Sequence, residues 1–321
     1  MKKQLLLAGF ILSGTLTANA QNVASTTTIT SGGLEAGSNG QKNTFYGYRA
    51  GKTSSNSSEG HNSFFGHEAG LSNNTGTHNV FVGTDAGRGN ISGTANVFIG
   101  DNAGGSNINE SGNVCIGSGS GANMTGNNNT YIGHQAGMET IGSGNVFIGN
   151  YAGFSNNNLS NSLIISNTET DFPLVMGNFS TSQLKLNGKV GIGSAFGNFP
   201  TTAGGVNLSN YNLFVKGGIL TEEVRVNLQS AWADYVFQPE YQLPTLIEVE
   251  KHIQEKGRLI NVPSAAQIAK EGIAIGEMLK IQQEKIEELT LYIIEQNKTN
   301  EKQAKDIEEL KKLVNNLTNN K

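Results

Sequence analysis

Two glycine-rich stretches are the first places in this sequence to look for chemistry, because glycine loops approach phosphate groups closely. Residues 47–53 (GYRAGKT) resemble a phosphate-binding loop, but three residues separate the two glycines and the Walker pattern requires four. Residues 117–121 (GSGSG) lack the dinucleotide-binding spacing, and no strand–helix–strand pattern surrounds them. We therefore expect no nucleotide site and no cofactor.

Histidines are the next candidates, and His61, His67, His78 and His134 all fall in one region of the chain. His67 and His134 occupy the same position of a repeat described below, but in units that are not adjacent. Metal binding within one chain is therefore not expected, whereas a threefold axis would bring three copies of one histidine together. Solvent-facing histidines are the simpler expectation, and we predict no metal site.

Asp234 lies beside Tyr235 and close to Trp232, which is the only tryptophan. A carboxylate next to aromatic rings can resemble a catalytic acid. A packed aromatic cluster with a helix-capping aspartate explains the same residues more simply. No Ser, His and Asp trio shows a local catalytic signature. The sequence thus predicts no catalytic residue and a protein that is not an enzyme.

The glycine-rich stretches and the four histidines lie in a region, from residue 43 to about residue 167, in which one sequence motif recurs. A typical copy is NVFVGTDAG at residues 79–87, and a degenerate eighth copy, NSLIISN, is expected to begin at Asn161. By subtraction, successive copies begin 19, 17, 17, 17, 16, 16 and 16 residues apart. Such a period predicts the stacked coils of a solenoid. The repeat positions are Asn43, Asn62, Asn79, Asn96, Asn113, Asn129 and Asn145, and Gly47, Gly66, Gly83, Gly100, Gly117, Gly133 and Gly149.

The strand residues of each copy are apolar on both faces. Val80 and Val82 point one way and Phe81 the other, although a coil of this size has only one interior. We expect one face to line the interior and the other to pack on a neighbouring subunit. The segments between copies, such as residues 71–77 and 123–128, are rich in Asn, Ser, Thr and Gly and are expected to be solvent loops.

Residues 1–20 have the lysines, apolar run and Ala-Asn-Ala end of a secretory signal peptide. We expect export through the inner membrane of a Gram-negative bacterium to the cell surface or beyond, with the periplasm as the alternative. No later stretch has the roughly 18 apolar residues of a transmembrane helix. The net charge of −4, without a basic cluster, argues against nucleic acid as a partner. Residues 21–42 are expected to be a flexible lead-in, and Cys115, the only cysteine, a small buried hydrophobe.

Three further segments follow the predicted solenoid, which spans residues 43–168. Residues 169–220 are expected to form a β neck, with Asn187-Gly188 as a two-residue hairpin turn. Residues 221–272 are expected to form a small helical module with capping boxes that begin at Thr245 and Ser264.

Residues 273–321 carry six consecutive heptads and predict a long coiled coil. The heptads alone leave the number of strands open, because Ile at a with Leu at d also suits dimers. Polar layers are expected at Gln282, Gln296, Asn300 and Gln303, where they weaken the core and fix its register. The apolar core positions are Leu279, Ile286, Leu289, Ile293, Ile307, Leu310, Val314 and Leu317.

The repeat resembles the head of the YadA-type trimeric autotransporter adhesins, whose short N-x-x-I-G…A repeats form a parallel β-roll. The resemblance covers somewhat over a third of the chain and implies a homotrimer that binds a host or cell-surface ligand, such as a glycan or a matrix protein. The period here is longer, and the chain ends in heptads rather than in barrel strands. A calcium-binding β-roll is disfavoured, because only Asp85 and Asp101 occur where its repeats need many aspartates.

The segment from Trp232 to Asn297 resembles the C-terminal region of secreted, tail-fibre-like repeat proteins of Gram-negative bacteria, in a position similar to that of endosialidase-type intramolecular chaperones. This resemblance implies a second hypothesis, a fibre protein whose module drives trimerisation. Those chaperones cut themselves at a Ser-Asp pair, and the present sequence has no Ser-Asp dipeptide. We therefore expect no self-cleavage.

Overall fold

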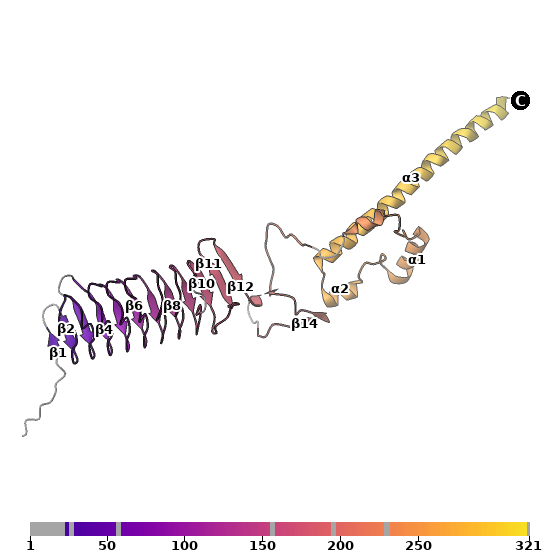
Figure 1. Ribbon diagram of the computed structural model, residues 1–321. Helices are drawn as coiled ribbons and strands as arrows, with labels where there is room; N and C mark the ends of the chain where they lie inside the picture. Colours follow the sequence, from indigo (N-terminus) through magenta and orange to yellow (C-terminus); the bar gives the residue numbers. More distant parts are fainter. Residues whose placement is uncertain are drawn as a thin grey trace, which may run out of the picture. The chain divides into compact units, whose positions relative to one another are not determined.

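The computed structural model describes residues 23–25, 29–55, 59–154, 158–193, 197–227 and 232–319 (Figure 1). The predicted signal peptide, residues 1–20, lies outside the described residues. The chain divides into two compact units, Met1–Gly188 and Lys189–Lys321, and each is described here by itself.

The described part of the first unit is a 12-stranded sheet whose strands follow one another in chain order (Figure 1). Strands β2 to β10 are parallel, each paired with the strand of the next coil, whereas β1 and the last two strands pair antiparallel. The predicted solenoid is confirmed, with one strand in each coil from β3 to β10. The bounds are β1 Val23–Ser25, β2 Ile29–Gly32, β3 Asn43–Tyr46, β4 Ser63–Phe65, β5 Val80–Val82, β6 Val97–Ile99, β7 Val114–Ile116, β8 Thr130–Ile132, β9 Val146–Ile148, β10 Ser162–Ile165, β11 Val175–Asn178 and β12 Gln183–Leu186.

A column of large side chains fills the solenoid interior. In-register pairing places the central residue of every strand above its counterpart, so that the Phe64 and Phe81 ring centroids lie 4.6 Å apart and those of Phe81 and Phe98 lie 5.0 Å apart. These rings are fully buried, which confirms that this strand face lines the interior. The column consists of Phe45, Phe64, Phe81, Phe98, Cys115, Tyr131, Phe147 and Ile164.

The repeated asparagines form a second buried column. Asn79 Oδ1 accepts a hydrogen bond from the Asn96 backbone N–H (2.9 Å), and Asn79 Nδ2 donates to the Gly93 carbonyl (2.8 Å). The same side-chain-to-backbone bond recurs from Asn43 to Asn145, so each asparagine satisfies backbone groups that water cannot reach. This need explains why asparagine recurs at this position in seven successive copies.

Part of the predicted solvent loops is buried. Asn73, Asn90 and Asn107 form another amide column, with Asn90 Nδ2 donating to Asn73 Oδ1 (2.6 Å) and Asn107 Nδ2 donating to Asn90 Oδ1 (2.9 Å). In the next coil Met124 takes this place, buried, with its sulfur 3.7 Å from that of Cys115. The methionine fills the space that the small Cys115 leaves in the aromatic column.

The structure differs from the sequence prediction at both ends of the solenoid. Strand β2 lies in the segment predicted to be a flexible lead-in, and it pairs in parallel with β3. The predicted hairpin turn at Asn187-Gly188 is wrong, because β12 pairs back with β11, and the next strand pairs elsewhere. Asn187 instead donates its Nδ2 to the Pro173 carbonyl (2.7 Å).

The described part of the second unit contains two small strand pairs, one 3₁₀ turn and three α-helices. The predicted helices are confirmed, with a complete capping box between Thr245 and Glu248, and Ser264 as the N-cap of α2. The bounds are β13 Val190–Ile192, β14 Thr202–Ala203, β15 Val206–Asn207, β16 Leu213–Val215, η1 Ala233–Phe237, α1 Leu246–Lys256, α2 Ala265–Glu271 and α3 Ile275–Asn319.

Candidate functional site

The glycines of the two stretches that resemble nucleotide-binding motifs lie where successive coils contact each other. A Cβ on Gly47 would lie 2.2 Å from the Gly66 carbonyl oxygen, and one on Gly117 would lie 2.4 Å from that of Gly133. Gly51 has φ +60°, and a Cβ there would lie 2.7 Å from the Phe45 ring. Coil stacking therefore accounts for these glycines, since L side chains fit neither the space nor the backbone.

A column of variable residues, which we call the turn column, follows the repeat glycines. Its members do not occupy the interior and differ in chemistry from coil to coil. The Tyr48 and His67 rings stack at the start of the column, with centroids 5.1 Å apart. The turn column consists of Tyr48, His67, Thr84, Asp101, Ser118, His134 and Asn150, all exposed or half-buried.

An ion-pair network runs beside the start of the turn column. Arg49 bonds Glu35 (2.9 Å) and reaches Glu68 (3.3 Å), and Arg88 contacts Glu68 (3.0 Å) and Asp85 (3.8 Å). Each arginine contacts two carboxylates, and the neighbouring Glu68 and Asp85 carboxylates share Arg88. The hydrogen bond from Lys52, followed by that from Arg49, lowers the pKa of the exposed Glu35 carboxyl.

His67, Glu68 and Asp85 have ligand atoms within 4.8 Å of one another, a grouping that the sequence pattern did not reveal. Both carboxylates contact Arg88, and Glu68 also contacts Arg49. A divalent cation would have to displace or oppose two guanidinium groups. The cluster is therefore better explained by the ion-pair network than by metal binding.

The other histidines of the solenoid do not converge on a common point. The His61 and His78 rings stack with centroids 4.8 Å apart, and His134 packs edge-on against Tyr151. Asp234 lies exposed in the first turn of η1 and does not cap it through its side chain.

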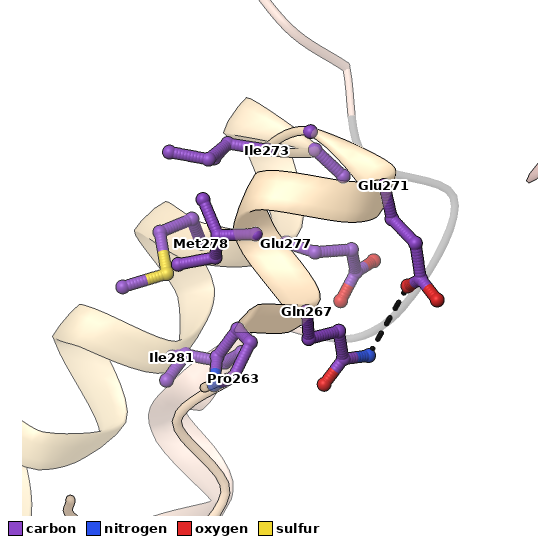
Figure 2. A pocket seen from close by; sticks show the side chains of 10 residues that line it. Pro263, Gln267, Glu271, Ile273, Glu277, Met278 and Ile281 are labelled. Carbon is purple, nitrogen blue, oxygen red and sulfur yellow. Dashed lines mark hydrogen bonds between the residues drawn. The ribbon is translucent and has the colours of Figure 1, made fainter. Parts of the chain in front are cut away.

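A pocket of about 160 Å³ lies between α2 and the start of α3 (Figure 2). Figure 2 shows Pro263, Gln267, Met278 and Ile281 among the residues that line it. Gln267 Nε2 donates to Glu271 (3.2 Å), so the amide is engaged within α2. The pocket is mainly apolar and does not gather groups for catalysis.

The carboxylates of α3 form the most buried polar cluster of the second unit. Tyr235 donates its hydroxyl to Glu284, Tyr241 donates to Glu288, and Lys285 bonds both carboxylates at 2.8 Å. Burial raises the pKa of Glu284, but the hydrogen bonds from Lys285, Tyr235 and Asn261 outweigh it and leave that pKa below its ordinary value. The hydrogen bond to Glu284, helped by burial, raises the pKa of Tyr235 to about 12. These contacts fasten η1 and the chain after it to α3.

Apolar residues of α3 are exposed, although its carboxylates are buried. In the predicted heptads Ile286 is at an a position and Leu289 at a d position, and they are 57% and 56% exposed. Glu284, Glu287 and Glu288, each 6% exposed, are at f, b and c, on the opposite side of the helix. The chain's own residues thus cover the polar side of α3 and leave its apolar stripe open.

The outer face of the solenoid sheet is also apolar, and it carries no charged residue in its two central columns. Val80 and Val82 are each 36% exposed. One column is Thr44, Ser63, Val80, Val97, Val114, Thr130 and Val146, and the other is Tyr46, Phe65, Val82, Ile99, Ile116, Ile132 and Ile148.

No protein-family model matches the chain, and no curated protein or solved structure is detectably similar to it. Among the described helices, none combines the length and apolar character needed to cross a membrane.

Proposed function

We propose that this protein is a secreted, non-enzymatic fibrous adhesin in which three identical chains associate through α3 and present their solenoids to a cell-surface ligand. The observation that carries the proposal is the reversed burial of α3, with carboxylates covered and the heptad stripe open. A helix of 45 residues with such a stripe is stabilised when equivalent helices cover it.

The chain's own contacts favour identical copies as the partners of α3. The stripe continues beyond the clamped segment, through Ile307, Leu310, Val314 and Leu317, all exposed. On the opposite side, the f positions change from the packed Glu284 and Leu291 to lysines at 298, 305 and 312. One continuous apolar stripe, which we call the seam, with a solvent-exposed opposite side is the pattern of a coiled coil.

The solenoid supplies a second surface for self-association and a separate one for ligands. Its uncharged outer sheet face suits contact with the same face of another copy, as in the trimeric heads that the repeat resembles. The turn column lies outside the buried interior and varies from coil to coil, so it is the surface we assign to ligand contact. Threefold display would make weak individual contacts, for example to a glycan or a matrix protein, collectively strong.

Sedimentation equilibrium of the full chain without residues 1–20 tests assembly. We expect a homotrimer at micromolar concentration, and expect Ile286→Glu to shift it toward monomer by placing a charge in the seam. Lys298→Glu, a charge change at an f position of the same helix, is the matched control and should leave the mass unchanged. A monomeric wild-type protein would overturn the proposal.

A glycan and matrix-protein array tests the adhesive role. The trimer should bind at least one immobilised ligand, and His67→Ala or His134→Ala, in the turn column, should change that binding without changing the sedimentation coefficient. If every turn-column variant binds as the wild-type protein does, the ligand-binding surface does not lie on this column.

A second candidate function, a structural fibre component with a trimerising C-terminal module, is favoured by the clamp of η1 on α3. It predicts normal assembly with no ligand on any array. Intact mass measured over days separates it from an autoprocessing protein, because we expect the full-length mass to persist.

A further inference from the structure

Helix α1 is well formed but has no buried residue within its own chain. Its ends are fixed by the Thr245–Glu248 capping box and by Gly257 in the left-handed conformation. Its apolar residues nevertheless remain open, with Leu246 61% and Ile247 78% exposed. An isolated helix of 11 residues is marginal in water, so its apolar face is expected to be covered by another surface.

The start of α1 is held at one particular edge of the α3 seam. Tyr292 donates its hydroxyl to the Pro244 carbonyl (2.5 Å), just before α1 begins. An open groove is then lined by Leu246 and Ile247 on one side and by Tyr292, Glu295, Gln296 and Thr299 on the other. In the heptads Tyr292 and Thr299 are g positions and Gln296 is a d position. The exposed end of α1 therefore lies beside the seam, on its g edge.

In a parallel coiled coil the g edge of one helix faces the e edge of its neighbour. The e positions of α3 at this level are Thr290 and Asn297, which are uncharged and exposed. A second α3 docked on the seam would thus bring these two residues toward Leu246 and Ile247. No like charges would meet there, and the contact would extend the seam without a break.

We infer that α1 is a collar that packs its Leu246–Ile247 end on the e edge of α3 in a second copy of this chain. The inference rests on the proposed assembly through α3 and names a further surface for it. The seam contains polar residues at Gln282, Gln296 and Asn300, which limit its stability. The collar adds a contact at one fixed level and so sets which heptads of neighbouring chains lie side by side.

Disulfide trapping between two differently tagged full-length chains tests the collar. Both chains carry Cys115→Ala to remove the native thiol; one also carries Ile247→Cys and the other Asn297→Cys. We expect mild oxidation to link the two tags in most co-assembled molecules. The matched control replaces Asn297→Cys with Glu301→Cys, a b position on the outside of the helix, and should give at least tenfold less link between tags.

Two further variants separate the collar from the assembly itself. Leu289→Cys, at a d position, should link chains across the seam and serves as the positive control. Ile247→Glu should speed subunit exchange between trimers at least tenfold, whereas Gln254→Glu, elsewhere on α1, should not. Seam links without collar links would overturn the collar and leave the proposed function intact, whereas a monomer without either link would overturn both.

Discussion

The solenoid buries aromatic rings and asparagine amides within a single chain, whereas α1 and α2 of the second unit bury no residue at all. In the solenoid each coil covers the coil before it, so the repeat itself provides every partner that the core requires. Among the described residues of the second unit, the buried side chains are carboxylates of α3 and the small apolar side chains of Ala233 and Val236, whereas most large apolar side chains of α1 and α3 are exposed. The solenoid therefore finds its core partners within one chain, whereas the exposed apolar side chains of the second unit are the surface on which the proposed association depends.

The largest expected effect is at a solenoid glycine. Gly83 has φ +134°, and a Cβ there would lie 2.4 Å from the Gly100 carbonyl oxygen. Gly83→Ala should lower the free energy of unfolding of the solenoid by more than about 3 kcal/mol, since backbone strain adds to a backbone clash.

Gly217 provides the matched control for Gly83. It has the same φ of +134°, but no heavy atom lies within 4 Å of the position that an added Cβ would occupy. Gly217→Ala should cost only about 1–2 kcal/mol, from backbone strain alone. Thermal unfolding followed by circular dichroism measures both. Equal losses would show that φ, rather than coil stacking, selects the repeat glycines.

The next effect is at a column asparagine. Asn79→Ala removes the acceptor of the Asn96 N–H and leaves that buried group unsatisfied. It also removes one of the two donors to the Gly93 carbonyl, which keeps the hydrogen bond from Asn90 Nδ2. We expect a loss of about 2–4 kcal/mol in denaturant unfolding. Asn109→Ala, an exposed asparagine of the same region, should change stability by less than about 0.5 kcal/mol. A small loss of stability in Asn79→Ala would mean that the asparagine column contributes little to the stability of the stacked coils.

The fifth coil allows a test of whether two neighbouring buried residues, Cys115 and Met124, are adapted to each other. Cys115→Phe should cost about 1–3 kcal/mol, because the ring meets Met124. Met124→Asn alone should cost a similar amount, since it leaves space beside the small thiol. Together they should be compatible, as the ring fills the aromatic column and the new amide can donate to Asn107 Oδ1, which is buried without a partner.

A double-mutant cycle measures this coupling. We expect the double variant to be more stable than the sum of the single changes by at least about 1 kcal/mol. Additive losses would show that the cysteine and the methionine were selected independently.

The solenoid could be predicted from sequence because its contacts repeat at a fixed spacing. In the first seven copies the period placed the strands, the asparagines and the glycines, and the capping box at Thr245 placed α1. The eighth copy begins at Ser162, one residue later than predicted, because Leu163 pairs with Val146. The buried Asn73 column escaped notice because its residues lie in segments whose other positions vary freely. Pairing partners set by distant segments were also hidden, as with β12, which returns to β11 instead of forming a hairpin at Asn187-Gly188.

The candidate surfaces show the same limit. Heptads indicated the seam residues, but not that η1 would cover the opposite side of α3. The bond between Tyr235 and Glu284 joins residues 49 positions apart and follows no period. The grouping of His67, Glu68 and Asp85 likewise depends on the stacking of adjacent coils. Local patterns therefore indicated which residues matter, and tertiary contacts decided what they face.

The smallest expected effect is in the clamp between η1 and α3, and it depends on pH. The pKa of Tyr235 is raised from its ordinary 10.0 to about 12, so its contribution is complete below pH 10 and is lost as pH rises toward 12. The pKa of Glu284 is lowered, so its contribution is present above its ordinary pKa of 4.5 and is lost as pH falls below that value. Fluorescence of Trp232, directly before η1, should report loosening at both extremes.

Tyr235→Phe should reduce the change between pH 10 and 12, keep the acid change, and cost about 1 kcal/mol at neutral pH, because the hydrogen bond is only partly shielded from solvent. Part of the alkaline change should remain, because the pKa values of Tyr241 and Lys285 in the same cluster are also raised. Tyr211→Phe, an exposed tyrosine of the same unit, is the matched control and should leave both changes in place. The comparison between the units is therefore sharpest at acid pH, where we expect the solenoid to be insensitive, because its interior column contains no carboxylate. At alkaline pH the solenoid also loses stability, since burial raises the pKa values of Cys115 and Tyr131. If the solenoid and the clamp loosen together as the pH falls below 4.5, the second unit does not respond independently of the first.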